Sequence, residues 1–468
     1  MVSAASATGS EPGRRSHLRT ILQLGGPLVI NNLAYAGITF ADTVMAGHIS
    51  ADALAAVAVG SNALQLQSLI GAGMMMALAP LVAHDYGAGR DTAAGGYMRQ
   101  ALWIALAMSV LPVIVALLAN RIYTGVGTAA PIIPTATAYT QAICCGVPAM
   151  FALQALTYTS EGLGRTRTIM LMTVAALPVN VLLNWVFMFG HWGAPALGAV
   201  GAAVASTITM WLALGFMILL MQRPSYARFA LFARFEWPNA AKLRGILRLG
   251  LPFTGSLVTE GSLFIGATLM VSALGATIVA AHQVALSYSL LTYMIPAAFH
   301  SATTVRVGHM LGGGQPEEAR RAGYVGIALC AGLMILSAVV LVFARGHIAR
   351  IYTDDPAVLE VATALLLLAG LFQVSDGLQL GCSGALRGYQ DARIPLAITV
   401  VSYWGIGFTL AWVFGIVRGG GAPGVWLGLI AGLTAAAMLL AARFSVLSAR
   451  VEKLSPPPGQ TPDRRSTG

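Results

Sequence analysis

Three acidic residues lie inside long apolar stretches of the sequence, where an ionised group is costly. Asp42 lies within ITFADTVM (38–45), Glu260 within SLVTEGSL (256–263) and Asp376 within FQVSDGLQ (372–379). A carboxylate at the centre of a bilayer costs about 2.5–3.5 kcal/mol on insertion scales. Because no Lys or Arg is expected at the same depth, each carboxylate must face a wet cavity, take up a proton or hold a cation. The predicted chemistry is reversible binding of H⁺ or Na⁺.

Glu260 and Asp376 both fall in the second half of the chain, and we expect them to form one cation-coupling site. Neighbouring side chains would add the oxygen ligands that a hard cation prefers. These supporting residues are Thr259, Ser262, Ser375 and Gln379. No other metal site is predicted, because the cysteines and histidines lack the spacing of metal ligands.

Polar residues of the first half would assist Asp42, which is itself a candidate for cation coupling. Asn180 and Asn184 are four residues apart and share one face of a helix. They would either bridge Asp42 or join two helices through hydrogen bonds. Gln283 would either line a central cleft or pack against a neighbouring helix.

The sequence contains no constellation of catalytic residues. No Ser/His/Asp or Cys/His set falls together at one membrane face, and the glycine-rich segments 87–90 and 312–314 do not follow strands. A phosphate-binding loop would need a strand before its glycines. We therefore expect no enzyme activity and no cofactor, apart from the coupling ion.

The composition indicates the elements that must position these residues. Hydrophobic residues make up 57% of the 468 residues, charged residues only 9%, and the mean hydropathy is +0.76. Soluble proteins have about 25% charged residues. These values exclude a soluble enzyme, a disordered chain and a secreted disulfide scaffold, and they favour an all-α polytopic membrane protein.

A helix needs about 20 apolar residues to cross the bilayer, and the apolar runs predict twelve such spans. Their ranges are 22–46, 53–83, 95–119, 132–160, 168–190, 196–221, 246–272, 278–305, 322–344, 357–383, 394–416 and 424–447. If the loops alternate from an N-terminus in the cytoplasm, the outer segments hold only Arg121, Arg345, Arg350 and Arg418 of the 27 basic residues. This asymmetry predicts that both termini are cytoplasmic, and it explains the positive charge without nucleic acid.

The two halves of the sequence repeat each other. A shift of 225 residues places Pro27 on Pro252, His84 on His309, and the glycines at 87–89 on those at 312–314. Each half has six spans, so the two six-helix lobes should share one topology and be related by an axis along the membrane normal. The predicted parts are a tail at 1–20, lobes at 21–222 and 246–447 joined by a basic linker at 223–245, and a tail at 448–468, of which the Pro-rich part 455–468 is expected to be disordered.

Five motifs in order resemble those of the multidrug and toxic compound extrusion (MATE) family, in its NorM-type branch. They are FADTVMAG at 40–47, LNW at 183–185, AAHQVAL at 280–286, VRVGH at 305–309 and LRGY at 386–389. The resemblance runs from about residue 20 to 447. It implies an antiporter of the inner membrane that expels cationic or aromatic drugs in exchange for Na⁺ or H⁺.

The resemblance also implies roles for the three acids. Glu260 and Asp376 match the proposed cation site of NorM-type members, and Asp42 matches an aspartate implicated in coupling or drug binding. NorM-type proteins often have a Tyr where Phe372 stands, and some relatives have an Asp where Asn184 stands. Both Na⁺ and H⁺ stay open as coupling ions, with a slight preference for Na⁺.

The drug cavity would be lined by adaptable Met and aromatic side chains. The candidates are Met45, Met74, Phe264 and Tyr288. We expect a monomer in the lipid bilayer. Two other functions stay open: a flippase for a lipid or lipid-linked sugar, which should have a cationic cavity, and a polytopic membrane enzyme.

Overall fold

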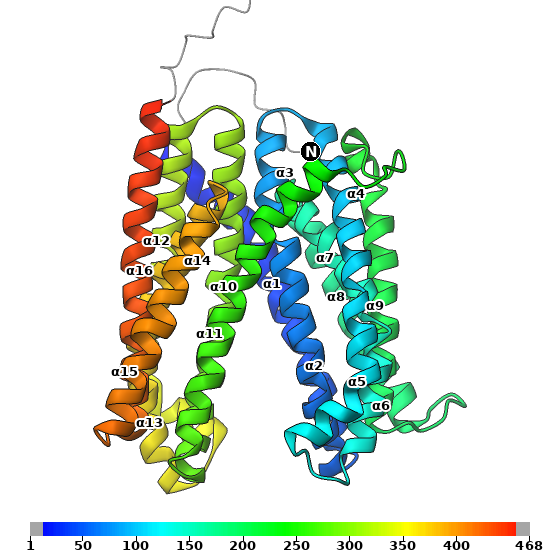
Figure 1. The fold of residues 1–468 in the computed structure, drawn as a ribbon, viewed down its shortest axis with the longest axis vertical. Helices are drawn as coiled ribbons and strands as arrows, with labels where there is room; N and C mark the ends of the chain where they lie inside the picture. Colours follow the sequence, from blue (N-terminus) through cyan, green and yellow to red (C-terminus); the bar gives the residue numbers. More distant parts are fainter. Residues whose placement is uncertain (1–12, 455–468) are drawn as a thin grey trace, which may run out of the picture.

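The computed structural model describes residues 13–454, which form helices and short connections (Figure 1). The remaining parts of the two predicted tails, 1–12 and 455–468, lie outside the described residues. Within the described range there are no strands. Eleven helices are long and apolar enough to span a membrane, or twelve when the bent pair of α6 and α7 counts as one. The predicted fold class is confirmed.

The first half contains nine α-helices and a short 3₁₀ helix. They are α1 (Arg14–Gly47), α2 (Ala51–Met75), α3 (Leu78–Gly87), α4 (Asp91–Met108), α5 (Val110–Val126), α6 (Ile133–Cys144), α7 (Val147–Gly162), α8 (Thr166–Phe189), α9 (Ala199–Met221) and η1 (Pro224–Phe229). Three pairs, α2 with α3, α4 with α5, and α6 with α7, each form one predicted span with a break inside it.

The second half contains longer, mostly unbroken helices. They are α10 (Ala240–Ser272), α11 (Ala276–Gly312), α12 (Pro316–Tyr352), α13 (Pro356–Gly388), α14 (Arg393–Val400), the π-helical η2 (Val401–Phe408), α15 (Thr409–Trp412), the π-helical η3 (Val413–Val417) and α16 (Gly421–Leu454). The repeat is thus close in topology, but the breaks of the first half have no counterpart in α11, α12 and α13.

Several helices extend beyond the apolar runs that predicted them. Helix α1 begins at Arg14, inside the predicted tail, and α10 begins at Ala240, inside the predicted linker. The Asn239 side chain caps α10 by accepting hydrogen bonds from the amides of Ala241 and Lys242, both at 3.1 Å. Hydropathy marks only the hydrocarbon-crossing part of a helix, so polar end turns escape it.

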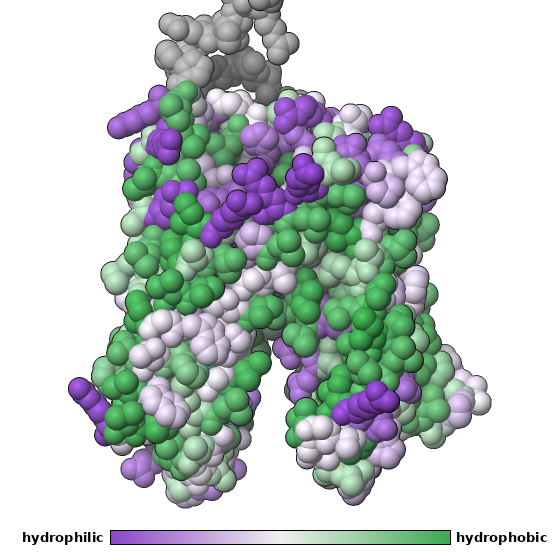
Figure 2. Space-filling view, in the orientation of Figure 1, coloured by the Kyte–Doolittle hydropathy of each residue, from purple (hydrophilic) through white to green (hydrophobic). Residues whose placement is uncertain are grey.

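The helices form two lobes that meet at one end and separate at the other. We call the end where α1 begins and α16 finishes the terminal end, and the opposite end the open end. Figure 2 shows a hollow between the two lobes at the open end. Helix α1 packs on α8 of its own lobe and also on α11 and α12, while α10 packs on α2 and α4 as well as on α14 (Figure 1). These two related helices therefore tie the lobes together.

The lobes pack most closely at the terminal end, where α3 meets α11. A Cβ atom on Gly87 would overlap the carbonyl oxygen of His309, and one on Gly312 would overlap that of His84. The two contacts are reciprocal, because the shift of 225 residues relates both the glycines and the histidines. A third contact joins α1 to α12, where His17 Nε2 lies 2.6 Å from Glu318 Oε2.

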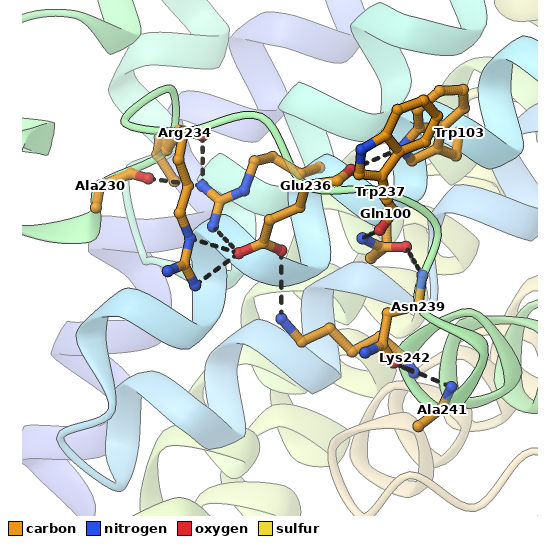
Figure 3. Close-up of polar contacts among 11 residues, drawn as sticks. Gln100, Trp103, Ala230, Arg234, Glu236, Trp237, Asn239, Ala241 and Lys242 are labelled. Carbon is orange, nitrogen blue, oxygen red and sulfur yellow. Dashed lines mark hydrogen bonds and ion pairs between the residues drawn. The ribbon is translucent and has the colours of Figure 1, made fainter.

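The linker between the lobes is held against α4 by a set of polar contacts that we call the linker clamp (Figure 3). Arg99 donates a hydrogen bond to Glu236 at 2.8 Å, and Trp103 donates to the Glu236 carbonyl oxygen at 2.9 Å. Gln100 donates to the Trp237 carbonyl at 3.0 Å and accepts from the Asn239 amide at 2.7 Å. The segment just before α10 is thereby fixed to the first lobe.

Glu236 should make the clamp sensitive to acid. The hydrogen bond from Arg99 lowers the pKa of Glu236 from 4.5 to about 2. A carboxyl whose pKa is lower in the folded state stabilises the fold above its unfolded pKa, and this contribution is lost as the pH falls from about 4.5 towards 2. We expect Glu236→Gln to lower the melting temperature at pH 7, and the difference from wild type to shrink towards pH 3. An exposed control, Glu360→Gln, should follow the wild-type pH profile, and a constant deficit in Glu236→Gln at all pH values would contradict this role.

Candidate functional site

Asp42 lies in a hydrogen-bonded network inside the first lobe, between α1, α8 and α9. Asn184 donates to Asp42 Oδ1 at 2.6 Å, and Ser206 donates to Oδ2 at 3.2 Å. Asn180 donates to Ser206 at 3.3 Å and accepts from Asn184 at 3.2 Å. Of the two roles left open for the asparagines, the structure shows both, because they contact Asp42 and join the helices.

Neutral donors surround Asp42, and no ion pair to it is present among residues 13–454. Both asparagines are fully buried, whereas Asp42 is half-buried. The network fixes the carboxylate without neutralising it. The arrangement can therefore accept a proton or a cationic group at Asp42.

Glu260 lies at the boundary between the lobes, in a cavity of about 200 Å³. The cavity is lined from both lobes by polar side chains that include Asn32, Tyr158, Tyr293, His300 and Gln379. Asp376, on α13, is 4% exposed and interacts electrostatically with Glu260. The structure thus places the two predicted acids in one electrostatically connected region of the second lobe.

Oxygen atoms without hydrogen-bond partners lie near this acid pair. Gln373 and Gln379 stand three residues either side of Asp376, so they share its helix face, and the Oε1 atom of each is buried without a partner in the described chain. The Tyr403 hydroxyl on η2 is also buried without a partner among the described residues, and it interacts electrostatically with both acids. Buried polar atoms normally have partners, and amide and hydroxyl oxygens suit a hard cation. The residues present fit an Na⁺ ion or a proton with water.

The predicted supporting hydroxyls have other partners. Thr259 donates to the Gly255 carbonyl of its own helix at 2.7 Å, and Ser375 pairs with Thr434 on α16 at 2.7 Å. Gln283 is exposed, while its neighbour His282 is buried and bonds to Trp426 at 3.1 Å. The glutamines 373 and 379 thus offer free oxygens, whereas Thr259 and Ser375 would have to exchange partners.

Arg387 lies beyond the end of the predicted span 357–383, but the structure does not place it in a loop. Helix α13 continues to Gly388, so Arg387 is 9% exposed and lines the same cavity as Glu260. Its guanidinium lies 4.9 Å from the centre of the Phe253 ring and contacts the sulfur of Met76. In the sequence, a basic residue at the end of an apolar run is typical of a loop. In the structure, the first lobe covers the end of α13 and buries Arg387.

Glu161 was also missed, so Asp42 is not alone among the deep acids of the first lobe. It is 5% exposed at the end of α7, hydrogen bonds to Ser301 of α11, and interacts electrostatically with Arg387. No signal in the sequence marks Glu161, because a charged residue at the end of an apolar run is ordinary. Arg387 therefore lies in the field of acids from both lobes, Glu161 and Glu260.

The four candidates for the drug cavity do not line the cavity around Glu260. Met74 is 7% exposed and packs beneath Gly250 of α10. Phe264 and Tyr288 pack against the core of the second lobe, where Phe264 lies 5.9 Å from the ring of Phe372. Met45 lines an apolar surface groove between α1 and α8. Three of the four thus contribute to packing.

Comparison with known proteins identifies the family. A sequence model of the MatE family matches residues 27–186 and again 252–413, which agrees with the internal repeat. The probable multidrug resistance protein NorM of Xanthomonas axonopodis pv. citri is 39% identical over 452 residues, covering 96% of this chain and 99% of its own. Multidrug resistance protein PmpM of Pseudomonas aeruginosa is 37% identical, covering 92% of each chain.

Solved structures share the fold. An outward-facing multidrug resistance MATE family transporter superposes with a TM-score of 0.86 at 19% identity, covering 93% of this chain and 97% of its own. The eukaryotic MATE transporter AtDTX14 gives a TM-score of 0.82 at 19% identity, covering 94% and 99%. The enzyme interpretation is wrong, and the duplicated lobes, the buried acids and the NorM relatives agree: this multi-pass membrane protein is a transporter that belongs to the MatE family.

Proposed function

We propose that the protein exports cationic and aromatic drugs across the inner membrane in exchange for Na⁺ or H⁺. The observation that carries the proposal is the pair Glu260 and Asp376, which lies beside buried oxygens that lack partners and next to a cavity between the lobes. Relatives named multidrug resistance proteins support drugs as the substrate class.

The terminal end is the cytoplasmic end in this proposal. The expected outer arginines lie at or near helix ends opposite the termini, while the basic linker lies with the termini, as the positive-inside rule requires. The hollow at the open end then faces outward, as in the outward-facing relative. From this state a cation reaches Glu260 and Asp376, drug leaves, and the lobes rock until the terminal end opens.

The net charge moved in each transport cycle determines how much the membrane voltage can contribute to drug export. Moving one elementary charge through 100 mV is worth about 2.3 kcal/mol, or roughly fiftyfold in concentration. One monovalent cation exchanged for one monocationic drug moves no net charge, so the voltage acts only when more than one ion is exchanged. Separate acid sites at Asp42 and at Glu260 with Asp376 would allow that.

The glycine contacts should decide how tightly the terminal end closes. Gly312→Ala would push a methyl group into the His84 carbonyl, and overpacking of this kind costs about 1–3 kcal/mol. We expect the outward-open state to lose population, which spin-label distances across the open end would report as shorter, together with slower efflux. Gly332→Ala is the matched control, because a Cβ there meets nothing within 4 Å. Distances equal to wild type in Gly312→Ala would contradict a close-packed gate.

A lipid flippase is the second candidate, and one observation favours it. Arg387 gives the cavity the cationic group that a phosphate headgroup would need. The same cavity also contains Glu260, and Glu161 lies nearby, so the acids offset its charge. This balance favours the drug antiporter.

Transport in proteoliposomes tests the proposal. The purified protein would be reconstituted with ethidium on one side, and an Na⁺ gradient or a pH gradient would be imposed separately. We expect one gradient to drive ethidium against its own gradient. The antiporter would be overturned if neither gradient drives ethidium transport. Movement of a fluorescent anionic lipid between the leaflets in the same proteoliposomes would then favour the flippase.

A further inference from the structure

The linker clamp leaves positive charge uncompensated at the terminal end. Three cations surround the single carboxylate of Glu236: Arg99 and Arg234 at 2.8 Å, and Lys242 at 3.5 Å. Glu236 is also the only acid in the sequence from 223 to 248, which holds six basic residues. One carboxylate cannot balance three cations, so the clamp retains capacity for a further anion.

Large aromatic side chains stand exposed on the same segment. Trp237 is 76% exposed and Phe235 is 69% exposed, although the clamp holds their backbone against α4 (Figure 3). Their rings pack edge to face at 5.3 Å, and Trp103 stacks on Trp237 at 6.3 Å. Rigid, exposed aromatic rings are typical of the level where lipid headgroups meet acyl chains.

Two further arginines on α10 mark the same level, where lipid headgroups meet acyl chains. Arg244 and Arg248 are exposed and one turn apart, so they share a helix face. Leu247 and Leu251 are exposed close by, at 37% and 58%, which places the start of the hydrocarbon region just beyond Arg248. Figure 2 shows hydrophilic residues in a band across this end of the molecule above a broad hydrophobic region.

An open depression lies beside the rings, with a volume of about 410 Å³. Arg234, Phe235, Trp237 and Lys242 line it, together with Glu236 and Asn239. The depression combines cationic and aromatic side chains around the Glu236 carboxylate. That combination matches an anionic phosphate that carries acyl chains better than a soluble anion.

We propose that this depression, lined by Arg234, Phe235, Trp237 and Lys242, binds the headgroup of an anionic phospholipid from the leaflet at the terminal end. The phosphate lies beside Arg234 and Lys242, and Trp237 and Phe235 pack on the glycerol and upper acyl carbons. Each basic side chain near such a headgroup contributes about fivefold in binding. The bound lipid holds the start of α10 against the first lobe.

The test compares lipid binding of matched double variants by native mass spectrometry in detergent. Wild type should retain phosphatidylglycerol in preference to phosphatidylcholine. Arg234→Gln with Lys242→Gln should weaken phosphatidylglycerol binding about tenfold or more, with phosphatidylcholine unchanged. The control, Arg121→Gln with Arg350→Gln, removes two exposed arginines from the open end and should bind like wild type.

Three results would overturn the proposal. The first is wild-type phosphatidylglycerol binding by the double variant of Arg234 and Lys242, and the second is an equal loss in the control. The third is competition by soluble glycerol phosphate at concentrations similar to those of the lipid, which would make this a site for a soluble anion. If the double variant is poorly folded, Trp237→Ser provides an independent variant, because the clamp uses only the backbone carbonyl of Trp237. It should also weaken phosphatidylglycerol binding, and wild-type binding would overturn the proposal.

Discussion

Glu260→Gln and Asp376→Asn are each expected to lower drug efflux about tenfold or more while leaving the amount of folded protein unchanged. Both substitutions keep the shape of the side chain but remove the negative charge that the coupling cation needs. Interactions with a charged group are worth about 1.5–3 kcal/mol, which corresponds to at least a tenfold loss. The measurement is ethidium efflux from cells that lack other drug pumps, normalised to the protein in the membrane.

The control for this pair lies on the same helix as Asp376. Glu360 is exposed near the start of α13, so Glu360→Gln removes one negative charge without touching the cavity. Its efflux should equal that of wild type. Wild-type efflux from both Glu260→Gln and Asp376→Asn would remove the acid pair from the mechanism.

Arg387→Gln is expected to make the protein hold its coupling cation too tightly. Arg387 lines the cavity of Glu260 and interacts electrostatically with it, so its charge repels any cation that approaches. Charged neighbours of this kind change cation occupancy about tenfold or more. We predict that half-maximal efflux needs about tenfold less Na⁺ or H⁺ and that the maximal rate falls several-fold, because the cation leaves slowly.

The comparison that isolates this effect uses Arg393, which is exposed at the start of α14. Arg393→Gln should keep both the wild-type cation dependence and the wild-type rate. A merely structural role for Arg387 would lower the rate and leave the cation dependence in place. That result would contradict competition between Arg387 and the cation.

Much of the fold could be predicted, because hydrocarbon imposes a minimum length on every span and the duplication repeats at a nearly constant offset. The breaks at 76–77, 109 and 145–146 could not, since bent helices remain apolar throughout. The helix starts at Arg14 and Ala240 were missed for the opposite reason. Their first turns contain basic or polar residues, so hydropathy does not detect them, although the Asn239 side chain caps α10.

The acids themselves were identifiable from sequence, because charge in an apolar stretch stands out. The residues that surround these acids could not be identified from the sequence. Arg387 and Glu161 lie at helix ends, where a charged residue is ordinary, and only packing of one lobe against the other buries them. The free oxygens of Gln373 and Gln379 depend on the rotation of α13, and nothing in one sequence distinguishes them from Ser375, which faces α16 instead.

The central claim is that Glu260 and Asp376 exchange a cation for drug, and countertransport tests it most directly. Proteoliposomes would be loaded with ethidium and diluted into dye-free buffer that contains tracer ²²Na⁺ and an external pH indicator. The account predicts that outward flow of the dye drives Na⁺ or H⁺ inward against its gradient, and that the flux disappears in the double variant Glu260→Gln with Asp376→Asn. Dye-driven uptake of either ion that persists in this double variant would contradict it.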